Sequence, residues 1–135
     1  MTDTVSLPPK GKSMTRHEQI DYVEFPARNI GATKRFFSKA FNWTFVDYGP
    51  EYTAFKSGAL AGGFFQSDLT VSTMTGSALI IFYSENLERT LAKVEFCGGN
   101  IVRPIFSFPG GRRFHFKDPS GNEFGVWSDR TSNLR

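Results

Sequence analysis

Arg112 to Ser128 reads RRFHFKDPSGNEFGVWS, and this stretch decides the fold. At its centre, Asp118-Pro119-Ser120-Gly121 has the composition of a tight turn. Proline presets φ at the second turn position, aspartate accepts hydrogen bonds from the amides beyond it, and glycine tolerates a positive φ. On both sides of the turn aromatic or apolar residues alternate with other types, which predicts strands with two different faces. The stretch is therefore predicted to form a β-hairpin.

Length, charge and composition limit the class of protein. The chain has 135 residues, enough for one domain with a sizeable core, and 15 of them are phenylalanine. A net charge of +3 is too small to indicate nucleic-acid binding, which needs a clustered basic face. No apolar run approaches the roughly 20 residues of a membrane span, and the N-terminus lacks the apolar core of a signal peptide. We therefore expect a cytoplasmic protein that binds neither nucleic acid nor membranes.

The first half of the chain predicts a strand, a helix and three further strands. The first strand begins at Ile20 and ends at Pro26, and Asn29 is a suitable N-cap for a helix over Ile30–Phe41. The three strands that follow are Trp43–Asp47, Tyr52–Lys56 and Leu60–Gln66. Residues 67–76 are predicted to be a polar linker. Residues 1–17 are predicted to be a disordered tail, with a second short tail at 131–135.

The second half repeats this order. A strand over Ala78–Tyr83 precedes a helix that Asn86 caps and that runs from Leu87 to about Cys97. A strand over Asn100–Pro104, which residues 105–107 can extend, then leads into the hairpin. Asn29 and Asn86 lie 57 residues apart, and Ser57-Gly58 echoes Ser120-Gly121. We therefore predict an α+β fold of two βαβββ modules, over about 18–66 and 77–130 within a domain of 18–130.

These features in this order resemble the vicinal-oxygen-chelate superfamily, which includes glyoxalases, bleomycin-resistance proteins and extradiol dioxygenases. The resemblance covers Ile20 to Ser128. It rests on the Tyr22–Pro26 strand, the Asn29–Phe41 helix with its Phe36-Phe37 pair, Asn42-Trp43, Cys97-Gly98-Gly99 and Asp118 to Asn122. It implies that each module curls a mixed sheet around a cavity, with its helix packed outside. It also implies that two chains pair as a homodimer.

The resemblance also identifies where a metal would be held. Enzymes of the superfamily hold a divalent ion with His and Glu side chains from the first and last strands of each module. The matching positions here are Tyr22, Gly62, Leu79 and Gly125, and none of these residues is a good ligand. We therefore expect neither a metal nor another cofactor.

Period two places several side chains on the strand faces that would line the cavity. These candidate ligand-binding residues are Tyr22, Glu24, Phe64, Leu79, Tyr83, Arg113, His115 and Trp127. Core packing is an equally good interpretation of Phe64 and Leu79. Tyr83 and Trp127 favour a pocket, because each combines a flat face with a polar group.

Glu24 and His115 are the two candidates with acid–base chemistry. A carboxylate among apolar neighbours is costly to bury unpaired, so Glu24 needs a partner such as Arg113, a ligand or a proton. His115 can be a hydrogen-bonded structural residue, or it can form an acid–base pair with Glu24.

Two kinds of function follow. The first is a metal-free binding protein that sequesters a small aromatic or cationic organic molecule, as bleomycin-resistance proteins do. The alternative is a lyase, isomerase or dioxygenase of the same superfamily. Such an enzyme would depend on a metal or would use Glu24 and His115 as catalytic residues.

Overall fold

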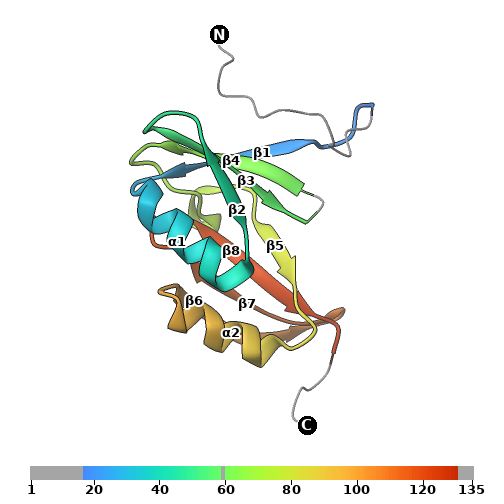
Figure 1. Ribbon diagram of the computed structural model, residues 1–135. Coiled ribbons are helices and arrows are strands. Elements are labelled where there is room, and N and C mark those ends of the chain that lie inside the picture. Colours follow the sequence, from blue (N-terminus) through green and yellow to red (C-terminus); the bar gives the residue numbers. More distant parts are fainter. Residues whose placement is uncertain (1–16, 59, 131–135) are drawn as a thin grey trace.

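Two four-stranded sheets with one helix each form the described part of this computed structural model, residues 17–58 and 60–130 (Figure 1). The first sheet has the order β1-β4-β3-β2 and the second β5-β8-β7-β6. The prediction of an α+β fold with two repeated modules is confirmed. The predicted tails fall, apart from His17, outside the described residues. The bounds are β1 Tyr22–Ala27, α1 Ile30–Phe41, β2 Thr44–Asp47, β3 Tyr52–Ser57, β4 Leu60–Gln66, β5 Ile80–Tyr83, α2 Leu87–Phe96, β6 Asn100–Phe108, β7 Gly111–Lys117 and β8 Glu123–Ser128.

Both sheets are mixed and have the same connectivity. The first strand of each module pairs in parallel with the last, β1 with β4 and β5 with β8. The remaining pairs are antiparallel. β1 and β5 therefore lie at sheet edges, because each has its partner strand on one side only.

The two helices begin where their caps predict. The Asn29 side chain accepts a hydrogen bond from the Ala32 amide at 2.9 Å, and Asn86 accepts one from the Arg89 amide at 3.1 Å. α1 ends at Phe41, and its C-cap Asn42 has a φ of 61°, in the left-handed region that stops a helix. No helix in the described ranges is long and apolar enough to cross a membrane.

The prediction that the first strand ends at Pro26 is wrong, because β1 continues through Ala27. Proline cannot donate a backbone hydrogen bond, but β1 is an edge strand, where a proline can face away from its neighbour. The Pro26 carbonyl accepts from the Asn122 side chain at 2.6 Å rather than from a strand. A contact from the other module therefore replaces the missing strand pairing on that side.

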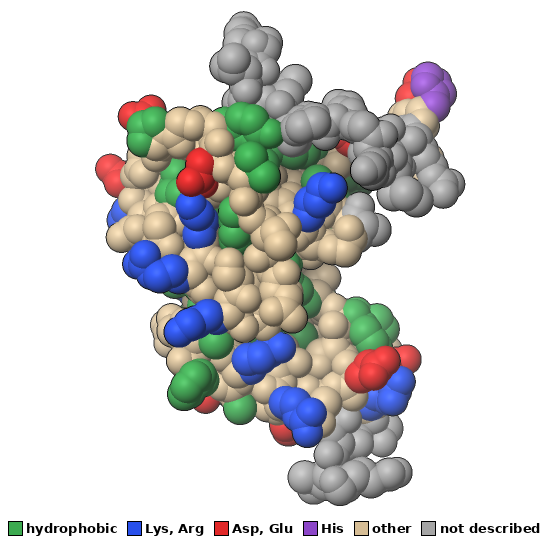
Figure 2. All heavy atoms as spheres, viewed as in Figure 1, with side chains coloured by type: hydrophobic (Ala, Val, Ile, Leu, Met, Phe, Trp, Pro, Cys, Tyr) green, Lys and Arg blue, Asp and Glu red, His purple; other side chains and the backbone are tan. Residues whose placement is uncertain are grey.

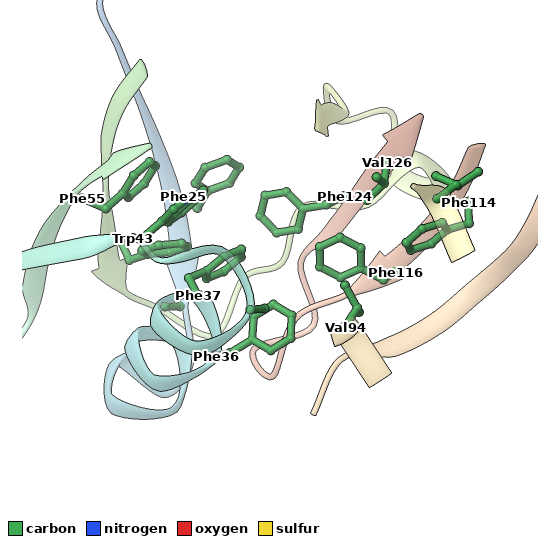
Figure 3. Close-up of a cluster of buried hydrophobic side chains, with 14 residues drawn as sticks. Phe25, Phe36, Phe37, Trp43, Phe55, Val94, Phe114, Phe116, Phe124 and Val126 are labelled. Carbon is green, nitrogen blue, oxygen red and sulfur yellow. The ribbon is translucent and has the colours of Figure 1, made fainter. Parts of the chain in front are cut away.

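The phenylalanines form one core that joins the two modules (Figure 3). Phe37 of α1 stacks on Phe64 of the first sheet, with ring centroids 5.6 Å apart, and meets Phe124 of the second sheet edge-on at 5.3 Å. Its neighbour Phe36 lies 5.8 Å from Phe116. α1 therefore packs against both sheets, and the aromatic content of the sequence is largely explained by this shared core.

The predicted turn at the end of β7 forms around Asp118. One carboxylate oxygen of Asp118 accepts from the amides of Ser120 and Asn122, both at 2.9 Å. Gly121 has a φ of 91°, which an L side chain rarely adopts. The other carboxylate oxygen is buried without a hydrogen-bond partner. The hairpin prediction is confirmed, with β7 and β8 paired through Lys117 and Glu123 next to the turn.

The same turn holds the first module in place. The Ser120 hydroxyl accepts from the amides of Arg28 and Asn29 at 3.1 and 3.3 Å, just before α1. The Asn122 side chain donates to Pro26 and accepts from the Val71 amide at 2.8 Å. Ser120 and Asn122 are fully buried, so these bonds form away from water. The turn therefore links β1, α1 and the linker to the second module.

The face that carries α1 shows more basic than acidic side chains. Lys and Arg side chains are spaced along its middle, with acidic groups mainly near its edges (Figure 2). This distribution fits the small net charge of the chain.

The buried turn makes a pH-dependent contribution to stability. Burial raises the pKa of Asp118 to about 6 from its usual 3.8, although hydrogen bonds from Asn122 and Ser120 oppose the rise. A carboxyl with a raised folded pKa stabilises the fold fully below its unfolded pKa, and this contribution is lost as the pH rises through the folded value. We predict that ionisation of Asp118 lowers the free energy of unfolding of the wild type by roughly 2 to 3 kcal/mol between about pH 4 and 6. Asp118→Asn cannot titrate, so the variant should not show this decrease. Urea unfolding of both proteins across this range measures it. A wild-type to variant difference that stays constant with pH would contradict the prediction.

Candidate functional site

Each sheet has one face that packs against helices and one that faces away from them, called the outer face here. On β1, Phe25 points into the core, whereas Tyr22 and Glu24 lie on the outer face. On β7 and β8, Phe114 and Val126 are core residues, so the alternate positions lie on the outer face. These alternate positions include Arg113, His115 and Trp127. The structure thus places most candidate residues on the outer faces.

Phe64 is the exception. Its side chain is fully buried in the core and stacks on Phe25 with ring centroids 5.4 Å apart. The placement of Phe64 on the cavity-lining face is therefore wrong. The cause is a slip of one residue in matching the two modules. β1 pairs Glu24 with Gly63, and the equivalent pair in the second module is Ile81 with Gly125.

Gly63, rather than Gly62, is consequently the first-module counterpart of Gly125. Glu24 and Ile81 each lie five residues before a helix cap, which fixes the equivalence. Gly62 pairs with Val23 and faces the core side. The position that the resemblance assigns to a metal ligand is still a glycine after the correction.

Three polar side chains form a chain of hydrogen bonds on the outer face of the first sheet. The Tyr52 hydroxyl donates to a carboxylate oxygen of Glu24 at 2.8 Å and lies 2.7 Å from the Tyr22 hydroxyl. Tyr22 must then donate to Tyr52. Burial raises the pKa of Tyr22, and burial together with the bonds to Tyr22 and Glu24 raises the pKa of Tyr52. Both phenols therefore stay neutral at physiological pH.

Gly63 is what makes room for this cluster. A methyl group at Gly63 would collide with the Tyr52 hydroxyl and would lie 2.9 Å from the Tyr22 hydroxyl. The space that a side chain would fill at this ligand position is thus used by the two tyrosines. Tyr52 was not among the candidates predicted from the sequence. Alternation along β3 places it on the same face as Ala54, opposite to Phe55, and this pattern could have identified it.

A second polar group lies on the outer face of the second sheet. The His115 Nδ1 atom is 2.9 Å from a carboxylate oxygen of Glu123, and both side chains are buried. The other carboxylate oxygen accepts from the Thr73 amide at 2.8 Å and from the Thr73 hydroxyl at 2.9 Å. Burial alone would raise the pKa of Glu123, but the bonds from Thr73 and His115 outweigh it and lower the pKa. Glu123 is therefore held as a carboxylate.

Aromatic and cationic side chains surround His115. The Phe106 ring centroid lies 5.9 Å from the imidazole, and the Arg103 guanidinium lies over Phe106 at 3.8 Å. The Arg113 guanidinium is 5.5 Å from Phe106 and 5.8 Å from the Phe108 ring. Cation–π contacts of this kind hold the charges against the face of the sheet.

Tyr83, Trp127 and Leu79 complete this outer face. Tyr83 and Trp127 meet edge-to-face at 5.2 Å, and the Tyr83 hydroxyl donates to Asp129 at 2.6 Å. This bond raises the pKa of Tyr83. A methyl group at Gly125 would lie 3.5 Å from Leu79 and 3.4 Å from Ile81, which are ordinary contact distances. Leu79 therefore borders the space above Gly125.

Glu24 and His115 are not brought together. Glu24 has Tyr52 as its partner on the first sheet, and His115 has Glu123 on the second. Among the described residues no hydrogen bond or ion pair joins Glu24 to His115 or to Arg113. The acid–base pair and the salt bridge considered from the sequence are thus replaced by local partners.

The four positions that would hold a metal in this fold do not fit one. They are occupied by Tyr22, Gly63, Leu79 and Gly125. A neutral phenol, a leucine and two glycines supply no set of anionic or imidazole donors. Nor do the described ranges contain a group of three or more His, Cys, Asp or Glu side chains placed to bind an ion.

A pocket of about 260 Å³ lies elsewhere, between the two modules. It is lined by Phe25, Trp43 and Phe55 of the first module and by residues 80–83 of β5. Tyr83 is the one candidate residue that borders it. The lining is mostly apolar and combines core residues of the first module with Ile81 and Tyr83, which belong to the outer face of the second sheet.

Comparison with known families identifies the class of protein. The sequence model of the Glyoxalase/Bleomycin resistance protein/Dioxygenase superfamily matches residues 19–126. The chain belongs to this superfamily. No curated protein sequence matches the chain.

Solved structures show the same fold at low sequence identity. A glyoxalase-related enzyme from Fulvimarina pelagi is 16% identical, with a TM-score of 0.70 over 83% of this chain and 88% of that chain. The fosfomycin resistance protein FosX from Mesorhizobium loti is 20% identical, with a TM-score of 0.67 over 88% and 96%. A mutant of FosX from Listeria monocytogenes, complexed with Mn(II) and 1S,2S-dihydroxypropylphosphonic acid, is 15% identical, with a TM-score of 0.70 over 88% and 94%.

The two equivalent glycines differ in how they tolerate a side chain. We predict that Gly63→Ala lowers the free energy of unfolding by about 1 to 3 kcal/mol, because the Tyr52 and Tyr22 hydroxyls must move. Gly125→Ala is the matched control and should cost less than about 1 kcal/mol, since its methyl group meets ordinary contacts. Chemical unfolding of both variants measures the difference. Equal effects would show that the tyrosine cluster does not depend on Gly63.

Proposed function

We propose that this chain binds a small aromatic or cationic organic molecule on the outer faces of its sheets, without a metal. The mode would be sequestration of the bleomycin-resistance kind rather than turnover. One observation carries the proposal. The four ligand positions hold Tyr22, Gly63, Leu79 and Gly125, while the faces around them keep aromatic rings and charged groups.

The first sheet supplies a site for positive charge. Glu24 is exposed, and its carboxylate lies beside the neutral phenols of Tyr22 and Tyr52. An accessible carboxylate next to aromatic rings favours a cation attached to an apolar body. The second sheet adds Trp127, Tyr83 and Phe108, which favour a flat ligand.

We further propose that the protein acts as a homodimer. The outer faces carry large apolar side chains that water can reach, with Val46 57%, Tyr83 47% and Ile81 41% exposed. The edge strands β1 and β5 also offer backbone groups for contact. A second copy that places one outer face over another would cover these groups and enclose a ligand.

Charge on Glu24 should matter for cationic ligands. We predict that Glu24→Gln weakens binding of benzyltrimethylammonium about two- to fivefold, the usual range for an exposed ion pair, and leaves benzyl alcohol binding unchanged. Isothermal titration or tryptophan fluorescence measures both. Because Glu24 is exposed, the melting temperature should change little.

Two outcomes would contradict the binding proposal. The first is unchanged benzyltrimethylammonium binding together with lower stability in Glu24→Gln, which would make Glu24 a structural residue. The second is turnover of 2-oxoaldehyde–thiol adducts or catechols, with or without added divalent metal. Turnover would favour a lyase, isomerase or dioxygenase.

The dimer has a separate test. We predict that sedimentation velocity at micromolar concentration shows one species of about twice the chain mass of 15.2 kDa. Ile81→Lys should shift it toward monomer, because it adds a charge to an apolar outer face. A monomer in the wild type would contradict the dimer and any cavity shared between chains.

A further inference from the structure

The fold leaves one ring nitrogen of His115 without a hydrogen-bond partner. The side chain is 5% exposed, and its Nδ1 atom is paired with Glu123 at 2.9 Å. The Nε2 atom is buried and has no hydrogen-bond partner. A buried polar atom without a partner is costly, so its retention needs a reason.

The neighbours of His115 determine what this nitrogen can do. Glu123 is held as a carboxylate by two hydrogen bonds from Thr73, and a carboxylate can only accept. The hydrogen between Glu123 and His115 must therefore sit on Nδ1. In a neutral imidazole this leaves a lone pair on Nε2, which is an acceptor. Glu123 thus acts as a positioning residue that fixes the tautomer of His115.

A second buried group without a partner lies on the same strand. The Nε atom of Arg113, which is a donor, is buried and makes no hydrogen bond. Arg113 and His115 are two residues apart on β7, so both lie on the outer face and their Cα atoms are about 7 Å apart. A benzene ring with two para substituents has a comparable length, so one planar ligand can contact both side chains. The face therefore presents an acceptor and a cationic donor to opposite ends of a ring.

Aromatic side chains flank both groups. Phe106 lies 5.9 Å from the His115 ring, and Phe106 and Phe108 both hold the Arg113 guanidinium. The charges that face His115 are Arg103 on β6, Arg113 and Lys117 on β7, and Glu123 on β8. Positive charge predominates, which favours an anion.

We propose that the outer face of the second sheet binds a planar aromatic hydroxy-acid. Its hydroxyl donates to Nε2 of His115, and its acid group accepts from Arg113. This inference rests on the proposed function and narrows its ligand class. Because Nε2 is covered in the ligand-free chain, a neighbouring side chain must move. Arg103, which is exposed and lies opposite His115 on β6, is a neighbour that can change rotamer at little cost.

The tautomer is tested without any ligand. The chain has two histidines, and His17 is 90% exposed, so its side chain serves as an internal reference in long-range proton–nitrogen NMR. At about pH 8, where an ordinary imidazole is neutral, His115 should show hydrogen on Nδ1 and a bare Nε2. In Glu123→Gln the amide oxygen accepts from Thr73 and the NH₂ group donates to Nδ1, so the hydrogen should move to Nε2. A wild-type His115 with its hydrogen on Nε2 would overturn the proposal.

Ligand class is tested with 4-hydroxybenzoate as the probe. Benzoate, which lacks the hydroxyl, and phenol, which lacks the acid, should each bind roughly tenfold more weakly, the usual effect of one lost buried hydrogen bond. In Arg113→Met, which keeps an unbranched apolar stem but has no guanidinium to donate hydrogen bonds, binding of 4-hydroxybenzoate should weaken to the level of phenol. Glu123→Gln should remove the preference for the hydroxyl. If Glu123→Gln does not fold, two measurements still test the inference. They are the tautomer of His115 in the wild type and the binding of 4-hydroxybenzoate to Arg113→Met.

Equal binding of 4-hydroxybenzoate and benzoate would overturn the inference, as would no binding of 4-hydroxybenzoate. The proposed function fails separately. If benzyltrimethylammonium binds while 4-hydroxybenzoate does not, the site on the first sheet stands and the ligand class named for the second sheet is wrong. If neither probe binds, both proposals are contradicted.

Discussion

The buried hydrogen bonds of the turn Asp118 to Asn122 are the constraint on which the rest of the structure depends. Ser120 and Asn122 bond to backbone groups around β1, α1 and the linker, 51 to 96 positions away in the sequence. Removing a partner would leave a buried polar group unsatisfied, at a cost of about 1 to 3 kcal/mol for each group. Because β8 begins directly after the turn, the same bonds also place Glu123 and Gly125 on their outer face. The hairpin therefore connects the stability of the core with the geometry of the site.

The division of each strand into a core face and an outer face explains how the metal site could be replaced. The core face carries the phenylalanines that join the modules through α1, and it tolerates little change. The outer face does not carry these phenylalanines, so the fold does not require the residues that hold a metal in enzymes of the superfamily at its ligand positions. In the first sheet the absence of a side chain at Gly63 leaves room for the hydrogen-bonded side chains of Tyr22, Tyr52 and Glu24. In the second sheet the acid nearest to Gly125 on the same face is Glu123, which pairs with His115.

Local signals in the sequence predicted much of the fold. The asparagine caps at Asn29 and Asn86 fixed both helix starts, and the alternation around Asp118 fixed the hairpin and the faces of Arg113 and His115. The register of β4 against β1 was not predictable in the same way. Gly62-Gly63 is followed by Phe64-Phe65, so a shift of one residue leaves the pattern of residue types unchanged. The bonds from Thr73 to Glu123 span 50 residues and arise from a linker without periodicity, so no local pattern pointed to them.

The central claim is that this member of the superfamily binds its ligand without a metal, and metal analysis tests it most directly. The protein is purified, dialysed gently, and examined by elemental analysis and by thermal unfolding with added nickel, zinc or manganese. We predict far less than one divalent ion per chain and no rise in melting temperature, since two side chains at most could reach an ion and a fuller set of ligands is needed for tight binding. About one ion per chain, with a thermal stabilisation by metal that disappears in Glu24→Gln or Glu123→Gln, would contradict the claim.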